Sequence, residues 1–145
     1  MTRIDFYILP EGGKPPEGAV MTACKLCDKA SSAGQRVYVY VPDGEVSGNV
    51  DSALWSFRQG SFVPHERQGA APLQQPLPAV LIGGAEPPDE YHEVMINLGA
   101  EVPAFFSRFE RVMEIVDGDA AQRAKSRERY KFYRDRGYEL ASHNL

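Results

Sequence analysis

Four basic residues near the carboxyl end of the chain have the spacing of a ligand-binding helix face. They follow one another at intervals of four, four and three positions, and they are Arg123, Arg127, Lys131 and Arg134. On a helix that turns by about 100° per residue, these side chains fall within one arc of about 80°, bordered by Tyr130. We expect this face to bind an acidic partner rather than to catalyse a reaction. The alternative is a solvated basic face.

The distribution of charge favours a short acidic ligand. Residues 1–118 contain 9 basic and 16 acidic residues, whereas residues 119–145 contain 7 and 4, within a net charge of -4 for the whole chain. An acidic body repels the flanking phosphates of a long nucleic acid, so a short peptide suits the positive segment better. The same segment has a second basic set on its far side, so at least one of the two stripes is solvated. This second set is Lys125, Arg129 and Arg136.

The cysteine pair Cys24 and Cys27 has the C-x-x-C spacing of redox and zinc motifs. A zinc site needs two further ligands at suitable spacing, but the three histidines are scattered singly. A redox pair belongs at a helix start directly after a strand, whereas this pair lies within a helical pattern. Both cysteines share the apolar face of that pattern, and we expect them to be buried as small apolar residues.

Other candidate motifs are weak. Residues 11–18 lack the glycine spacing of a nucleotide-binding loop, and Pro15 and Pro16 remove amide donors that a phosphate would need. Ser61 lacks the flanking pattern of a catalytic serine, and we expect His65 to bond to the backbone. An acidic turn is a candidate metal site, and its residues are Asp89, Glu90, His92 and Glu93. The acidic residues precede the strand that would orient them as ligands, which argues against a metal. We therefore expect no catalytic residue, no metal and no cofactor.

Periodicity and turn residues predict alternating strands and helices. Alternating and branched apolar residues predict strands at residues 3–9, 36–41, 79–82, 93–98 and 112–116. Apolar spacing predicts helices at residues 17–33 and 51–57, a short helix opening at Pro103, and a last helix from Asp119 to about Arg136. Gly34 and Gly137 are expected to end two of these helices, and residues 58–78 form a long connection.

This order of elements predicts an α/β fold with one doubly wound, mostly parallel sheet and helices on both faces. The length and the unbroken pattern predict a single domain, residues 1–145. The sequence has no apolar run long enough for a membrane span and no secretory signal pattern, so we expect a cytoplasmic protein. A fold of this kind does not by itself supply an activity.

Three blocks of sequence resemble the chi subunit family of bacterial DNA polymerase III holoenzyme. They lie at residues 5–9 (DFYIL), from residues 53–55 (ALW) through residues 61–65 (SFVPH), and at residues 127–134 (RERYKFYR). Their order and spacing cover nearly the whole chain, although the cysteine pair is not part of the family pattern. The resemblance implies a single chi-like α/β domain and a non-catalytic accessory subunit of the clamp-loader assembly.

The resemblance also implies two partners. One is the psi subunit, and the other is the acidic C-terminal tail of single-stranded DNA-binding protein, so that contact with DNA is indirect. By similarity, the psi surface includes Trp55 and Phe62. The tail site by similarity comprises Val116, Arg123, Arg127 and Tyr130, with Lys131 and Arg134 beside them. Arg123 stands where the family pattern often has lysine.

Two other functions remain open from the residues alone. One is a small nucleotide-binding α/β enzyme, because the fold class accommodates such sites. The other is a direct single-stranded DNA binder that would stack bases on the tyrosines of the last helix. The acidic body disfavours the second function.

Overall fold

The computed structural model describes residues 1–12, 17–56, 62–69 and 71–145. The strands are β1 (Arg3–Ile8), β2 (Val37–Tyr40), β3 (His65–Arg67), β4 (Val80–Gly83), β5 (Val94–Asn97), β6 (Arg111–Val116) and β7 (Glu139–Asn144). The helices are α1 (Glu17–Ser32), α2 (Gly44–Ser56) and α3 (Ala120–Asp135), with a 3-10 helix at Phe106–Arg108. The phosphate-loop candidate at residues 11–18 lies partly outside the described residues, and Phe57 and Ser61 lie wholly outside them.

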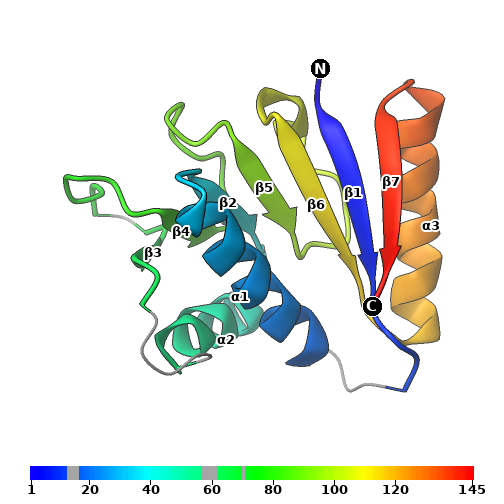
Figure 1. Ribbon diagram of the computed structural model, residues 1–145, viewed down its shortest axis with the longest axis horizontal. Helices are drawn as coiled ribbons and strands as arrows, with labels where there is room; N and C mark the ends of the chain where they lie inside the picture. The colour runs from blue at the N-terminus through cyan, green and yellow to red at the C-terminus, as the bar shows by residue number, and fades with distance from the viewer. Residues whose placement is uncertain (13–16, 57–61, 70) are drawn as a thin grey trace.

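The strands form one sheet of seven in the order β3-β4-β2-β5-β6-β1-β7 (Figure 1). Every strand pair in the described ranges is parallel. The predicted α/β class with one mostly parallel sheet is therefore confirmed. Parallel neighbours require crossover connections, and these connections place the helices over the faces of the sheet.

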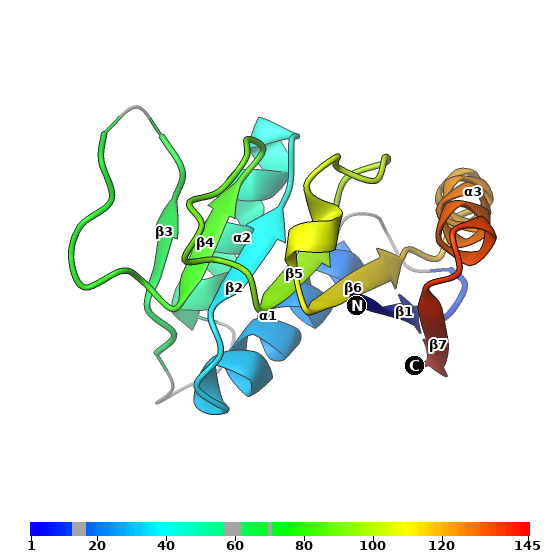
Figure 2. The same ribbon diagram turned by 90° about the horizontal axis from the view of Figure 1, so that it is seen from above.

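The helices cover both faces of the sheet (Figure 2). One apolar cluster joins α1 and α2 to strand residues such as Met113 and Ile115. A second cluster joins α3 and the 3-10 helix to the opposite face, where Val112 and Val116 point. Because successive residues of a strand point to opposite faces, β6 supplies both layers of the core.

Helix ends follow the signals in the sequence. Asp119 caps α3 by accepting a hydrogen bond from the backbone N–H of Gln122 at 2.7 Å. Gly34 and Gly137 have φ values of 82° and 79°, a region that glycine enters without the clash of a Cβ. Both predicted glycine stops are confirmed.

Three elements differ from the prediction. Helix α2 begins at Gly44 rather than at residue 51, because Asp43 Oδ1 accepts hydrogen bonds from the N–H groups of Glu45 and Val46 and caps an earlier turn. Strand β3 lies inside the segment predicted as an irregular connection, and β7 follows a helix that was expected to be the last element. Neither of these two strands has the alternating apolar pattern from which strands are recognised.

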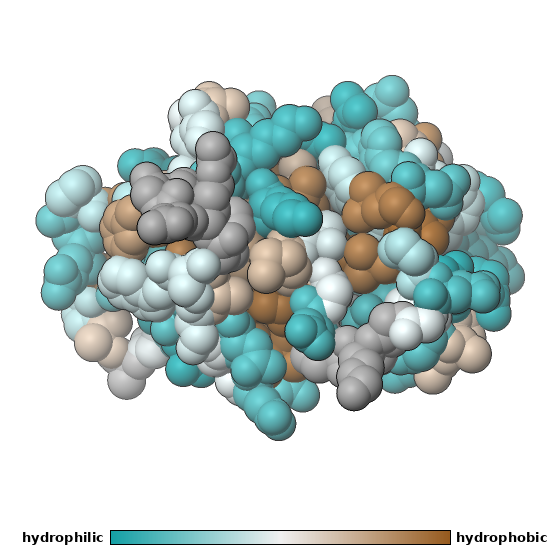
Figure 3. All heavy atoms as spheres, turned by 60° about the horizontal axis from the view of Figure 1, so that its bottom comes forward, coloured by the Kyte–Doolittle hydropathy of each residue, from teal (hydrophilic) through white to brown (hydrophobic). Residues whose placement is uncertain are grey.

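Cys24 and Cys27 are fully buried on α1, as predicted. Burial raises the pKa of Cys24 to about 11 and that of Cys27 well above its usual value, so both thiols stay protonated at neutral pH. In the part of the chain that the structure describes, no helix is both long and apolar enough to cross a membrane. Seen from the carboxyl ends of the strands, the surface is largely hydrophilic, and hydrophobic side chains emerge in small groups (Figure 3).

Candidate functional site

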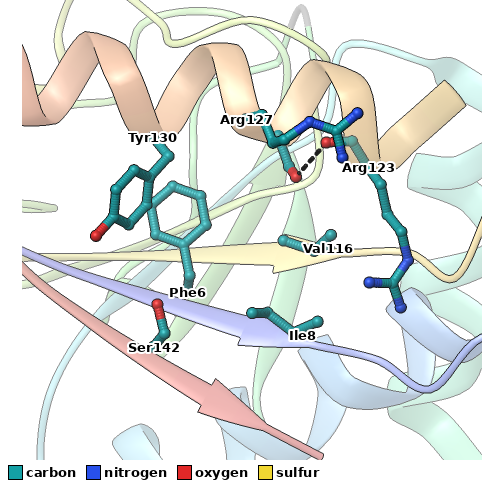
Figure 4. Close-up of a pocket in the computed structure, with 8 residues that line it drawn as sticks. Phe6, Ile8, Val116, Arg123, Arg127, Tyr130 and Ser142 are labelled. Carbon is teal, nitrogen blue, oxygen red and sulfur yellow. Dashed lines mark hydrogen bonds between the residues drawn. The ribbon is translucent and has the colours of Figure 1, made fainter. Parts of the chain in front are cut away.

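A pocket of about 270 Å³ lies between α3 and the strands beneath it. The structure brings together here four of the residues assigned to the tail site by resemblance, namely Val116, Arg123, Arg127 and Tyr130. Figure 4 shows Tyr130 beside Phe6 at one end of the pocket, and Arg123 and Arg127 extending from α3 at the other. An apolar group and a negatively charged group of one ligand would both find complementary surfaces here.

The apolar end of the pocket is fixed by aromatic packing. The ring of Tyr130 lies 5.3 Å from the ring of Phe6, centroid to centroid, in a tilted arrangement. Phe6 and Val116 belong to the buried cluster under α3, whereas 37% of Tyr130 is exposed. The pocket wall is therefore anchored in the core, and only its outer side is open to solvent.

The two arginines differ in their freedom to bind a ligand. Arg123 Nη2 donates a hydrogen bond to the backbone oxygen of Leu9 at 2.8 Å, while its Nε is buried without a described partner. Arg127 is exposed, and no described residue forms an ion pair or hydrogen bond with its guanidinium. Arg127 is therefore the residue with a free guanidinium fork, which can grip both oxygens of a carboxylate.

Lys131 and Arg134 are exposed on α3 but do not line the pocket. Arg134 lies 3.4 Å from the carboxylate of its neighbour Asp135, and both side chains are more than half exposed, so this ion pair is weak. Both cations lie farther along α3, away from its start at Ala120. They extend the positive surface beyond the pocket without forming its wall.

Four further residues line the pocket that sequence analysis did not assign to it: Phe6, Ile8, Ser126 and Ser142. Phe6 and Ile8 alternate along β1 toward the face under α3, and their pattern in the sequence indicates only a strand. Ser142 lies on β7, which was not predicted. Only the parallel pairing of β7 with β1 brings Ser142 into the site.

The second basic set on α3 is solvated only in part, because Arg129 is buried while Lys125 and Arg136 are exposed. Its Nε donates to Glu114 at 2.8 Å, and Glu114 also accepts hydrogen bonds from Asn97 at 2.9 Å and Tyr133 at 2.6 Å. Burial and then the Glu114 carboxylate raise the pKa of Tyr133, which keeps its phenol protonated as a donor. This network ties α3 to the centre of the sheet and so holds the pocket wall in place.

An aromatic patch lies on the other half of the molecule. Trp55 and Phe62 are 62% and 59% exposed, and their ring centroids are 5.1 Å apart. His65 packs edge-on against Trp55 at 4.9 Å. Adjacent exposed aromatic rings of this kind are typical of interface centres.

His65 forms the backbone contact predicted for it, because its Nδ1 lies 2.7 Å from the oxygen of Val63. Its Nε2 faces the carboxylate of Asp51 at 3.4 Å, a contact whose geometry does not make a hydrogen bond. The imidazole side chain is fully buried. His65 therefore supports the aromatic patch from below.

The acidic turn after β4 does not form a metal site among the described residues. Glu93 accepts a hydrogen bond from the backbone N–H of Arg36 at 3.0 Å, and Asp89 lies 3.5 Å from the guanidinium of Arg108. Glu93 therefore ties the residue before β5 to the residue before β2, and Asp89 lies beside Arg108 at the surface.

The chain is thus a parallel α/β fold with a single sheet, and it has a pocket that is apolar at one end and cationic at the other. The family model described as "DNA polymerase III chi subunit, HolC" matches residues 1–141. The chain belongs to this family of DNA replication accessory subunits, as the sequence resemblance implied.

Two relatives illustrate the match. The DNA polymerase III subunit chi of Pseudomonas aeruginosa is 38% identical, over 100% of this chain and 98% of that protein. The subunit chi of Haemophilus influenzae is 29% identical over 97% of this chain and 95% of that protein. Among solved structures, the crystal structure of T4 UvsW superposes with a TM-score of 0.67 at 8% identity, covering 99% of this chain and 41% of that one. At this identity the last similarity concerns the fold alone.

Proposed function

We propose that this subunit is a non-catalytic adaptor of the clamp-loader assembly that links the psi subunit to the acidic C-terminal tail of single-stranded DNA-binding protein. The tail would occupy the pocket beneath α3, and psi would bind the aromatic patch of Trp55 and Phe62. Through the tail the subunit would reach DNA only indirectly, in the cytoplasm where replication takes place.

The observation that carries the tail assignment is the exposed guanidinium of Arg127, which pairs with none of the described residues and lies next to an apolar pocket. By the same family resemblance, this tail is acidic and ends in a phenylalanine with a free carboxylate. Its terminal ring would contact Tyr130 and Val116, and its carboxylate would form a two-pronged hydrogen bond with Arg127. Arg123 would add positive charge, but its bond to Leu9 leaves fewer of its donors for the ligand.

The psi assignment is supported by the exposure of two large aromatic side chains in one patch. Aromatic residues that remain exposed in a single chain concentrate binding energy when a partner covers them. The patch lies near β3 at one edge of the sheet, whereas the pocket lies near β7 at the other edge. The two partners would therefore bind simultaneously.

The first prediction concerns the tail site. Arg127→Ala should weaken binding of an acidic peptide ending in phenylalanine by about 1.5–3 kcal/mol, the cost of losing a charged hydrogen-bonded contact. Isothermal titration of wild-type and variant protein measures this difference. The melting temperature should stay unchanged, since Arg127 is exposed and bonds to no described residue.

Lys125→Ala is the matched control for this experiment. It removes one positive charge from an exposed position on the far side of α3 and so changes net charge equally. Its affinity for the peptide should stay within about twofold of wild type, because exposed distant charges are screened. If both variants lost the same affinity for the peptide, net charge alone would explain the effect, and Arg127 would no longer be assigned to the tail site.

A further inference from the structure

Strand β7 is an edge strand with an open side. Among the described strands it pairs with β1 alone, and the strand order places it at the end of the sheet. The N–H of Leu145 donates to the oxygen of Ile8 at 2.9 Å, so the backbone groups of alternate residues before it also point toward β1. The backbone groups of Leu140, Ser142 and Asn144 must then point outward, where an added strand would meet them.

This open edge is continuous with the pocket. The side chain of Ser142 lines the pocket, while its backbone belongs to the outward-pointing set. In Figure 4, Ser142 lies on β7 across from the residues of α3. A chain that enters the pocket from the side of β7 would therefore pass the edge of the sheet.

The cations of α3 mark the direction in which such a chain would run. Helix α3 follows β6 and returns antiparallel to the strands (Figure 1). Arg127, at the middle of the helix, therefore lies nearer the carboxyl ends of the strands than Arg134, which is in its last turn. The distance along the helix from Arg123 to Arg134 is about 16 Å, and six-residue β7 is about 17–20 Å long. The positive stripe and the open edge thus run side by side over the same length.

We infer that the acidic tail, beyond its terminal phenylalanine, adds to the sheet as an eighth strand along β7. With its carboxyl terminus at Arg127, the tail would run parallel to β7 and continue the all-parallel order of the sheet. Its upstream aspartates would lie near Lys131 and Arg134, which gives a role to the two cations that do not line the pocket. This inference rests on the proposed function of the pocket.

A backbone N-methylation scan tests strand addition without altering the protein. The probe is a synthetic acidic peptide of about nine residues that ends in phenylalanine and carries one N-methyl group at a time. In an added strand, every second N–H donates to Leu140 or Ser142, and the intervening ones face solvent. Methylation should therefore lower affinity by about 2- to 12-fold at alternate positions and by less than about twofold between them.

Asn144→Pro provides a protein-side measurement. Proline removes one outward N–H and leaves the pairing of β7 with β1 intact, and edge strands tolerate it. The variant should weaken the nine-residue peptide but not a peptide of the last three residues, which reaches only the pocket. An unchanged melting temperature establishes that the variant is folded.

The outcomes separate this inference from the proposed function. A flat methylation scan, with binding that still depends on Arg127, overturns strand addition and leaves the pocket assignment standing. No binding of the unmodified peptide overturns the pocket assignment and strand addition together. Alternation with a period of two residues supports the eighth strand, because neither charge nor the pocket alone produces it.

Discussion

Glu114→Ala is expected to lower the free energy of unfolding by about 3–5 kcal/mol. Glu114 is fully buried and accepts hydrogen bonds from Arg129, Tyr133 and Asn97. Its removal leaves the buried guanidinium of Arg129 without a counter-charge. An uncompensated buried charge destabilises a fold far more than the loss of an exposed ion pair does. Urea denaturation followed by circular dichroism measures the loss as a lower midpoint at an unchanged slope.

The double variant Glu114→Leu/Arg129→Met is the informative control. It removes both charges and replaces them with apolar side chains, so it should recover a large part of the stability that Glu114→Ala loses. Glu128→Ala, on the exposed side of α3, should change stability by less than about 0.5 kcal/mol. If the free energy of unfolding of Glu114→Ala is within about 1 kcal/mol of wild type, then the network does not hold α3 to the sheet.

Trp55→Ala should weaken binding of the psi subunit by about 2–4 kcal/mol, the range of an aromatic residue at an interface centre. The Trp55 side chain is 62% exposed in the isolated chain, so its truncation should leave the fold stable. Loss of the indole also removes the ring contacts that Phe62 and His65 each make with Trp55. Surface plasmon resonance with immobilised psi measures the difference.

Tyr130→Ala is the reciprocal control for the aromatic patch. It truncates an exposed aromatic residue at the pocket and should weaken the acidic peptide while leaving psi affinity unchanged. Trp55→Ala should show the opposite pattern. If both variants lose both partners, then the assignment of two separate surfaces is wrong.

The fold was predictable wherever local chemistry determines it. Helix α3 begins after Asp119 and ends before Gly137 as expected, because a side-chain cap and a left-handed turn depend only on neighbouring residues. Strand β7 was not predictable in this way, since its sequence has no apolar alternation and its position depends on backbone bonds to β1, over a hundred residues away. The early start of α2 is hard to recognise in the sequence, because Pro42, Asp43 and Gly44 also have the composition of a turn.

The candidate site was predictable in its helical part only. Spacing alone placed Arg123, Arg127 and the bordering Tyr130 on one face of α3, and the family resemblance added Val116. In the sequence, Phe6 and Ile8 have only the pattern of buried strand residues. Ser142 could not be assigned to the pocket, because the sequence does not indicate the strand on which it lies. Spacing also placed Arg129 on a charged face, but only the structure shows that its partner is a buried glutamate.

The most direct test of the adaptor proposal is a three-component capture. The acidic peptide is immobilised, psi is passed over it with or without this subunit, and the retained psi is measured. Psi should be retained only when the wild-type subunit is present, and either Arg127→Ala or Trp55→Ala should abolish its retention. Retention of psi without the subunit, or no retention although each partner binds the subunit separately, would contradict the account.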